Sequence, residues 1–164
     1  MVKVEIFGLA LDETGKSPII VLKDESDTMV LPIWIGAMEA MAISIAINKV
    51  PFPRPMTHDL LLNTLTALGG TINRVEVTDI ENGTFFAEIV VTTDKETKRI
   101  DSRPSDAIAL AVRAECPIWV GESVMDEAGA PFPEHSETVI RTEDSDKWME
   151  ELDKLSEEDT KYKM

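Results

Sequence analysis

The chain of 164 residues has one cysteine, Cys116, so it cannot form an internal disulfide, and we expect a reducing compartment. One cysteine and two histidines are too few for a zinc site unless carboxylates complete the ligand set. The longest nearly apolar run, Ile33 to Ile47, contains Glu39 and is too short to cross a bilayer. The N-terminus alternates apolar and polar residues, unlike a signal peptide. These absences predict a cytoplasmic protein that does not enter a membrane.

Common catalytic motifs are also absent. The sequence has no GxGxxG, no P-loop, no HExxH and no nucleophile motif built on serine or cysteine. We therefore expect no organic cofactor.

Positive charge is scarce. The net charge is −15, and residues 122–164 contain 14 acidic but only 5 basic side chains. An acidic chain repels nucleic acid, whose affinity for proteins comes largely from neutralised phosphates. Binding would need metal ions or a local basic patch, for which the candidates are Lys95, Lys98, Arg99 and Arg103. The ordinary explanation of the charge is solubility.

Several segments have the composition of β-strands. Apolar and polar residues alternate, or β-branched residues gather, at 2–11, 18–23, 29–35, 72–80, 84–92 and 97–101. Asn82-Gly83 separates two of these segments, and both residues tolerate a positive φ. The pattern predicts an antiparallel meander followed by a hairpin and one further strand.

Three helices are expected in the first 125 residues. The segment 37–48 is apolar on nearly every side, which predicts a helix buried all round. A second helix is expected from an N-cap at Thr57 to Gly69-Gly70, and a third from about Pro104 to Glu115. We place a domain at 1–125 and an acidic appendage at 126–164, with a loop over 126–137 and a charged helix over about 145–156.

One short motif occurs twice. Pro-Ile-Trp-Ile-Gly at 32–36 returns as Pro-Ile-Trp-Val-Gly at 117–121. The two copies indicate either a pseudo-symmetric packing or shared local chemistry.

Two ionisable residues stand on apolar helix faces. His58 shares a face with Leu61, Leu62 and Leu65, and the start of a helix disfavours its charged form, so a neutral imidazole could act as a general base. The alternative is a hydrogen-bonded histidine that closes the core. Glu39 has apolar neighbours, so it either pairs with a cation, for which Arg54 and Arg103 are candidates, or has a raised pKa. The alternative is a first-turn glutamate that stabilises the helix N-terminus.

The densest polar cluster is Asp101-Ser102-Arg103-Pro104-Ser105-Asp106, at a predicted strand-to-helix junction. Helix capping by Ser102 or Ser105 explains much of it. Capping does not explain Arg103, because a positive charge at a helix N-terminus is unfavourable without a partner. The arginine could hold a phosphate, and the carboxylates a divalent cation.

Three segments resemble those of the bifunctional nuclease domain family: Leu31 to Gly36 with Glu39-Ala40, Arg54 to Leu61, and Asp101 to Ala111. The resemblance extends over about residues 2–125. It implies an α+β fold with strongly bent mixed and antiparallel sheets around helices, a homodimer, and activity of the kind described for plant relatives, which degrade DNA and RNA. Seven residues fall in the shared segments: Glu39, Arg54, His58, Asp59, Asp101, Arg103 and Asp106.

We carry two hypotheses forward. The first is a nuclease assisted by Mg²⁺ or Mn²⁺, in which Asp59, Asp101 and Asp106 bind the metal, His58 is the base, and Arg103 or Arg54, with Glu39, completes the catalytic group. The second is a dimeric binding or regulatory module without catalysis, held by a buried network of Glu39 and arginine. In that case Arg103→Ala should cost about 3–5 kcal/mol of stability.

Overall fold

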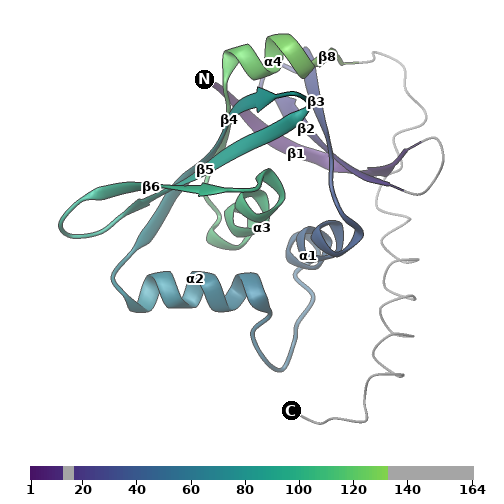
Figure 1. Cartoon of the computed structure of the whole chain (residues 1–164). Coiled ribbons are helices and arrows are strands. Elements are labelled where there is room, and N and C mark those ends of the chain that lie inside the picture. The colour runs from purple at the N-terminus through teal and green to yellow at the C-terminus, as the bar shows by residue number, and fades with distance from the viewer. Residues whose placement is uncertain (13–16, 133–164) are drawn as a thin grey trace.

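The computed structural model describes residues 1–12 and 17–132 of the protein. Within them the chain forms a mixed sheet with helices packed on it, which confirms the α+β class (Figure 1). The strands are β1 (Val2–Leu11), β2 (Pro18–Asp24), β3 (Met29–Trp34), β4 (Thr71–Glu81), β5 (Thr84–Thr92), β6 (Thr97–Ser102), β7 (Ile118–Val120) and β8 (Ala130–Pro131). The helices are α1 (Ala37–Ile47), α2 (Thr57–Ala67), α3 (Pro104–Ala114) and α4 (Glu122–Ala128).

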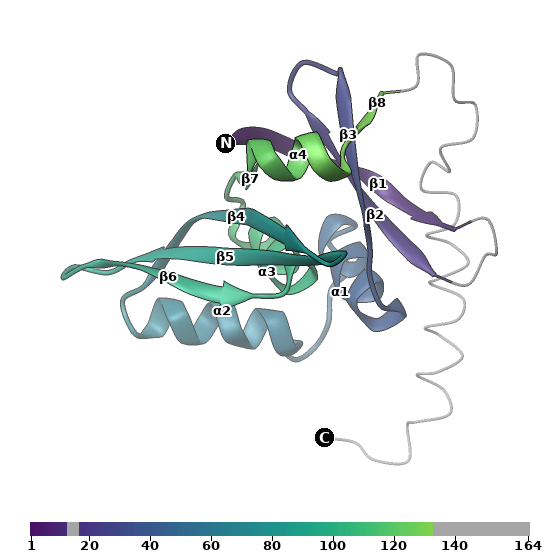
Figure 2. The same ribbon diagram turned by 45° about the horizontal axis from the view of Figure 1, so that its top comes forward.

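All eight strands belong to one sheet, in the order β6-β5-β4-β7-β1-β2-β3-β8. Neighbouring strands are antiparallel except β4 and β7, which are parallel. The sheet bends strongly, so that β4–β6 and β1–β3 form two arms joined by the short β7 (Figure 2). This agrees with the bent mixed sheet that the family resemblance implies.

The strand boundaries follow the sequence pattern closely. The predicted hairpin at Asn82-Gly83 is confirmed: Asn82 has a φ of 50° and Gly83 a φ of 78°, and the turn joins β4 to β5. Side chains alternate between the faces of β4, so Val75 and Val77 enter the core while Glu76 lies on the opposite face. The face bearing the valines therefore receives the helices.

Helix α3 is the central helix of the core. It packs against α1, α2, β4 and β5, and most of its residues are buried, Ile108 and Leu110 completely (Figure 1). Helix α1 was expected to be buried all round, and this is wrong. Helix α1 packs against α3 and β2 with Ala40, Ile43 and Ile45 buried, while Met38, near its N-terminal end, is 68% exposed.

The region after residue 121 also differs from the prediction. The prediction of a loop over 126–137 is wrong for its first residues, because 126–128 form the last turn of α4. This helix packs on β3 and β4. A short β8 follows and pairs with β3. The helix predicted near 145–156 lies outside the described residues.

A buried carboxylate stabilises the turn between β2 and β3. Asp24 accepts hydrogen bonds from the backbone N–H groups of Thr28 (2.8 Å) and Met29 (2.9 Å) and from the hydroxyls of Ser26 and Thr28. Burial alone would raise the pKa of Asp24, but these hydrogen bonds lower it far below its usual range. The carboxylate is therefore ionised across the neutral and mildly acidic range.

We expect Asp24→Ala to lower the free energy of unfolding at pH 7 by about 1–3 kcal/mol, because it leaves donors without an acceptor. Since the folded-state pKa of Asp24 lies below its unfolded value of about 3.9, the carboxylate stabilises the fold above that pH and loses this effect as the pH falls. Urea unfolding at pH 7 and pH 3 should thus show a smaller difference between variant and wild type at pH 3. The exposed Asp79→Ala is the control, and an undiminished difference at pH 3 would contradict the assignment.

Candidate functional site

The junction of β6 and α3 supplies the centre of the site. Strand β6 ends at Ser102, Arg103 is the residue that precedes the helix, and Pro104 occupies its first turn, where the missing N–H of proline costs nothing. The predicted capping by Ser102 or Ser105 is wrong, because no side chain caps this helix. Instead, the acidic Asp106 lies in the first turn and partners the arginine.

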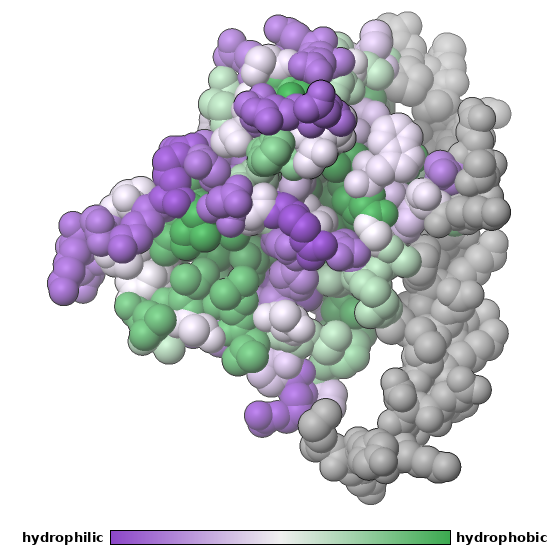
Figure 3. All heavy atoms as spheres, in the orientation of Figure 1, coloured by the Kyte–Doolittle hydropathy of each residue, from purple (hydrophilic) through white to green (hydrophobic). Residues whose placement is uncertain are grey.

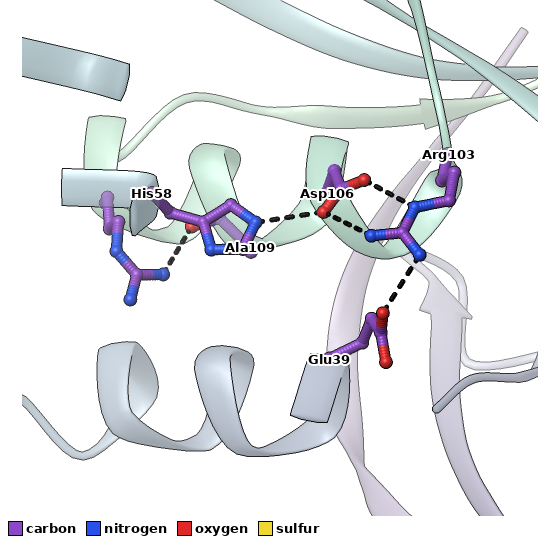
Figure 4. Close-up of polar contacts among 6 residues, drawn as sticks. Glu39, His58, Arg103, Asp106 and Ala109 are labelled. Carbon is purple, nitrogen blue, oxygen red and sulfur yellow. Dashed lines mark hydrogen bonds and ion pairs between the residues drawn. The ribbon is translucent and has the colours of Figure 1, made fainter. Parts of the chain in front are cut away.

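Arg103 bridges two helices (Figure 4). Its Nε and Nη2 donate to the two carboxylate oxygens of Asp106 at 2.7 and 3.1 Å, and its Nη1 donates to Oε1 of Glu39 at 2.9 Å. This confirms the expectation that Arg103 has a carboxylate partner, and it identifies the cation beside Glu39. The hydrogen bonds to Asp106 and then to Glu39 raise the pKa of the guanidinium.

The guanidinium retains donors for a ligand. An arginine has five N–H groups, and three are used in these contacts, which leaves one on each terminal nitrogen. The Arg103 side chain is also 65% exposed, so a ligand in solvent can reach it. Such a fork suits the oxygens of a phosphate or carboxylate group.

His58, at the start of α2, meets the same carboxylate. Its Nε2 lies 3.0 Å from Oδ1 of Asp106 (Figure 4). Burial raises the pKa of Asp106, but the hydrogen bonds from Arg103 and His58 outweigh burial and lower that pKa below its usual value. Asp106 is therefore ionised at neutral pH and can only accept hydrogen bonds. We therefore assign the shared proton to Nε2, which leaves the lone pair of a neutral ring on Nδ1.

A second ion pair joins α2 to α3 beside the first. Nε of Arg113 donates to Oδ1 of Asp59 at 2.6 Å, and Nη1 donates to the carbonyl of Ala109 at 2.8 Å. Sequence reasoning missed Arg113. The available indication was that Arg113 follows Asp106 by seven residues, two turns of helix, which places both on the same face of α3.

Three predicted site residues lie outside the group around Arg103: Asp59 pairs with Arg113, and Arg54 and Asp101 lie elsewhere. Arg54 is exposed in the segment between α1 and α2 and makes no hydrogen bond or ion pair with the described residues. Asp101 is exposed on β6 opposite Glu88, and alternation puts it on the face of the sheet that carries Glu76, away from α3. The structure thus brings together Glu39, His58, Arg103 and Asp106.

As arranged, the predicted metal ligands do not fit a divalent cation. Asp106 has both oxygens in contact with Arg103, Asp59 is bound to Arg113, and Asp101 points to the other face. In the part of the chain that the structure describes, no group of three or more His, Cys, Asp or Glu side chains is arranged to hold a metal. The role of Asp59, Asp101 and Asp106 as ligands stays a prediction that this geometry does not support.

The predicted basic patch on β6 is largely neutralised. Lys98 pairs with Glu96 at 3.0 Å, and Arg99 pairs with Glu76 and Glu88 on the outer face of the sheet. Arg103 also pairs with two carboxylates, and it is the candidate cation for a phosphate near α3 because of its position directly before that helix.

Helix α2 presents an exposed apolar surface beside these polar residues. Figure 3 shows hydrophobic residues gathered over α2, whose Leu60 and Leu61 are exposed, as is Leu68 immediately after the helix. None of the helices within the described ranges has the length and hydropathy that crossing a bilayer requires.

Comparison with known proteins agrees with the family resemblance. A sequence profile described as the bifunctional nuclease domain matches residues 20–133. An uncharacterized protein of Mycobacterium tuberculosis is 36% identical over 165 residues, which cover 98% of this chain and 99% of that protein. Bifunctional nuclease 1 of Arabidopsis thaliana is 31% identical over 116 residues, which cover 68% of this chain but 36% of the plant protein. Bifunctional nuclease 2 of Oryza sativa subsp. japonica is 30% identical over 144 residues, covering 85% and 44% of the two chains.

Proposed function

Because the chain belongs to the bifunctional nuclease domain family, we propose that it cleaves phosphodiester bonds of DNA or RNA at the group formed by Glu39, His58, Arg103 and Asp106. The observation that carries this proposal is the continuous line of contacts from His58 through Asp106 to Arg103. A proton acceptor and a cation then share one ionised carboxylate, next to solvent.

His58 is the proposed base. Phosphodiester cleavage requires a proton to be removed from the attacking hydroxyl, which is a water or, in RNA, the 2′-hydroxyl. The imidazole of His58 can accept that proton on Nδ1 while Nε2–H stays hydrogen-bonded to Asp106. The attacking oxygen then bonds to phosphorus, the bond from phosphorus to the leaving sugar oxygen breaks, and that oxygen takes its proton from solvent. The imidazolium that results lies beside an ionised carboxylate, which stabilises it as in other His–Asp pairs.

Arg103 is the proposed phosphate ligand. Its two remaining N–H groups can donate to the non-bridging oxygens, whose negative charge increases in the transition state. Glu39 and Asp106 hold the guanidinium from two sides, so its orientation is set before a substrate arrives. The two carboxylates also outweigh the single positive charge, so a phosphate would bind here through directed hydrogen bonds and against a locally negative field.

Some finer features remain proposals. Assistance by Mg²⁺ or Mn²⁺ has no fitting ligand set among the described residues, so we assign the metal no step. A homodimer is supported by the exposed leucines of α2, and a cytoplasmic location by the single cysteine.

The activity is tested on tag-free protein with three substrates: supercoiled plasmid, single-stranded DNA and RNA. Each is incubated with Mg²⁺, with Mn²⁺ and with EDTA. We expect cleavage of at least one substrate, in an activity that co-elutes with the protein through two chromatographic steps. Absence of cleavage under every condition would refute the proposed function. Cleavage with Mg²⁺ or Mn²⁺ but none with EDTA would show that the reaction requires a metal ion.

A further inference from the structure

We infer that Arg113 and Asp59 form a positioning pair that holds α2 against α3, so that His58 meets Asp106. Its catalytic consequence rests on the proposed function, but its structural consequence does not. Neither residue is assigned to the reacting group above.

Helix α2 is attached to the core by few apolar contacts. No residue of α2 is fully buried, and of its leucines only Leu62 and Leu65 pack in part against the core. Leu60 is 57% exposed, and Leu68, immediately after the helix, is 77% exposed. Since the burial of apolar area is the main force that docks a helix, α2 needs other contacts to fix its position.

The ion pair supplies those contacts. The Arg113 side chain is only 7% exposed, and its guanidinium is held by Asp59 of α2 and by the carbonyl of Ala109 in its own helix. The second oxygen of Asp59 accepts the backbone N–H of Met56, the residue before α2, at 2.9 Å. The carboxylate of Asp59 thus contacts both the backbone at the start of α2 and the Arg113 side chain of α3.

This anchor lies directly beside the histidine. Asp59 follows His58 in the sequence, so a shift of the carboxylate moves the histidine backbone with it. Arg113 and Asp106 lie on the same face of α3, where Asp106 contacts His58 and Arg113 contacts Asp59. The pair therefore sets the approach of the imidazole to Asp106. Because Arg113 is buried and has carboxylate and carbonyl partners, it acts by position rather than by touching the substrate.

The test uses Arg113→Gln, which removes the charge, and Asp59→Asn, which removes its partner. Arg113→Lys, which keeps the charge but not the fork, covers the case in which Arg113→Gln does not fold. The matched control is Arg99→Gln, which removes another arginine from a carboxylate, on the far face of the sheet. Asp106→Asn provides the reference spectrum for a histidine that has lost its ionised acceptor.

The first measurement is the His58 imidazole resonance by NMR, in a His135→Gln background that leaves one histidine. We expect Arg113→Gln and Asp59→Asn to shift this resonance toward its position in Asp106→Asn, and Arg99→Gln to leave it in place. Amide hydrogen exchange in α2 should accelerate by about tenfold or more relative to α3, as expected of a helix that opens locally.

The second measurement is kinetic. We expect kcat to fall by about 10²-fold with KM little changed, since misplacing a reacting group by about 1 Å costs on that order. An unchanged His58 resonance and unchanged exchange in α2 in Arg113→Gln or Arg113→Lys would overturn the inference, whatever the activity. An inactive wild type whose variants show the expected shifts would instead refute the proposed function and leave the positioning pair standing.

Discussion

Replacing His58 with glutamine is expected to lower the rate of phosphodiester cleavage by about 10²–10⁴-fold, the range over which a general base contributes. The amide of glutamine can still donate to Asp106, as Nε2 of the imidazole does, but it cannot take up a proton. The variant thus removes the base while it keeps the contact between α2 and α3. Initial rates on the best substrate of the wild type measure the effect.

The control for this variant is His135→Gln, at the second histidine of the chain. It should keep full activity, and both variants should unfold at the same denaturant concentration as the wild type. Equal rates of cleavage by His58→Gln and His135→Gln would show that His58 is not the base. Parallel purification of the two also tests for a contaminating nuclease, which would give both the same activity.

Arg103→Ala is expected to lower cleavage by about 10²–10³-fold, the usual loss when one donor to a developing negative charge is removed. Its effect on the free energy of unfolding should be at most about 1 kcal/mol. The side chain is 65% exposed, and ion pairs that solvent can reach contribute little. Rates and urea unfolding curves of the same preparation measure both quantities.

This prediction separates the two hypotheses for the polar network. The hypothesis of a non-enzymatic module predicts a buried Glu39–Arg103 pair and a loss of about 3–5 kcal/mol with Arg103→Ala. The structure differs on the burial, because the side chain of Arg103 is 65% exposed and that of Glu39 is 23% exposed. Arg103→Lys is the companion variant: it keeps the charge but cannot contact Asp106 through two nitrogens. We expect intermediate cleavage from it. A strongly destabilised but fully active Arg103→Ala would favour the structural module.

The acid sensitivity of the site has the same origin as that of the turn at Asp24. Hydrogen bonds from arginine outweigh burial and lower the pKa of Asp59 and Asp106. Both carboxylates therefore stabilise the folded state above their unfolded pKa of about 3.9, and both contributions are lost as the pH falls below it.

Local pattern was sufficient for most of the fold. The alternation along 2–11 and 72–80 and the Asn82-Gly83 turn depend on neighbours in sequence, and these elements appear close to their predicted bounds. The burial of α1 does not follow from its own sequence, because its contacts with α3 and β2 decide which of its apolar residues are covered. Helix α4 has seven residues, too few to show a period, yet the repeated motif did contain an indication of it. In both copies the final glycine, Gly36 or Gly121, immediately precedes a helix.

The site was predictable where a residue conflicted with its own surroundings. Arg103 at a helix N-terminus and Glu39 among apolar neighbours each needed a partner, and the structure pairs them. Asp101 looked equivalent to Asp106 in sequence, but the face on which a strand residue lies depends on pairing register, here with Glu88. Arg113 gave no conflict, since a basic residue in the last turn of a helix is favourable.

The three-residue β7 has a consequence for how the chain folds. Its Ile118 pairs with Val4 on β1 and with Val75 on β4. Val4 and Ile118 are more than one hundred residues apart in the sequence, so a long-range contact depends on this short strand. The β1–β3 meander and the β4–β6 meander each close through local turns, whereas the junction at β7 requires a long loop to close first. High contact order of this kind slows folding. We therefore expect the two arms to form early and their union through β7 to be the slow step that completes the sheet.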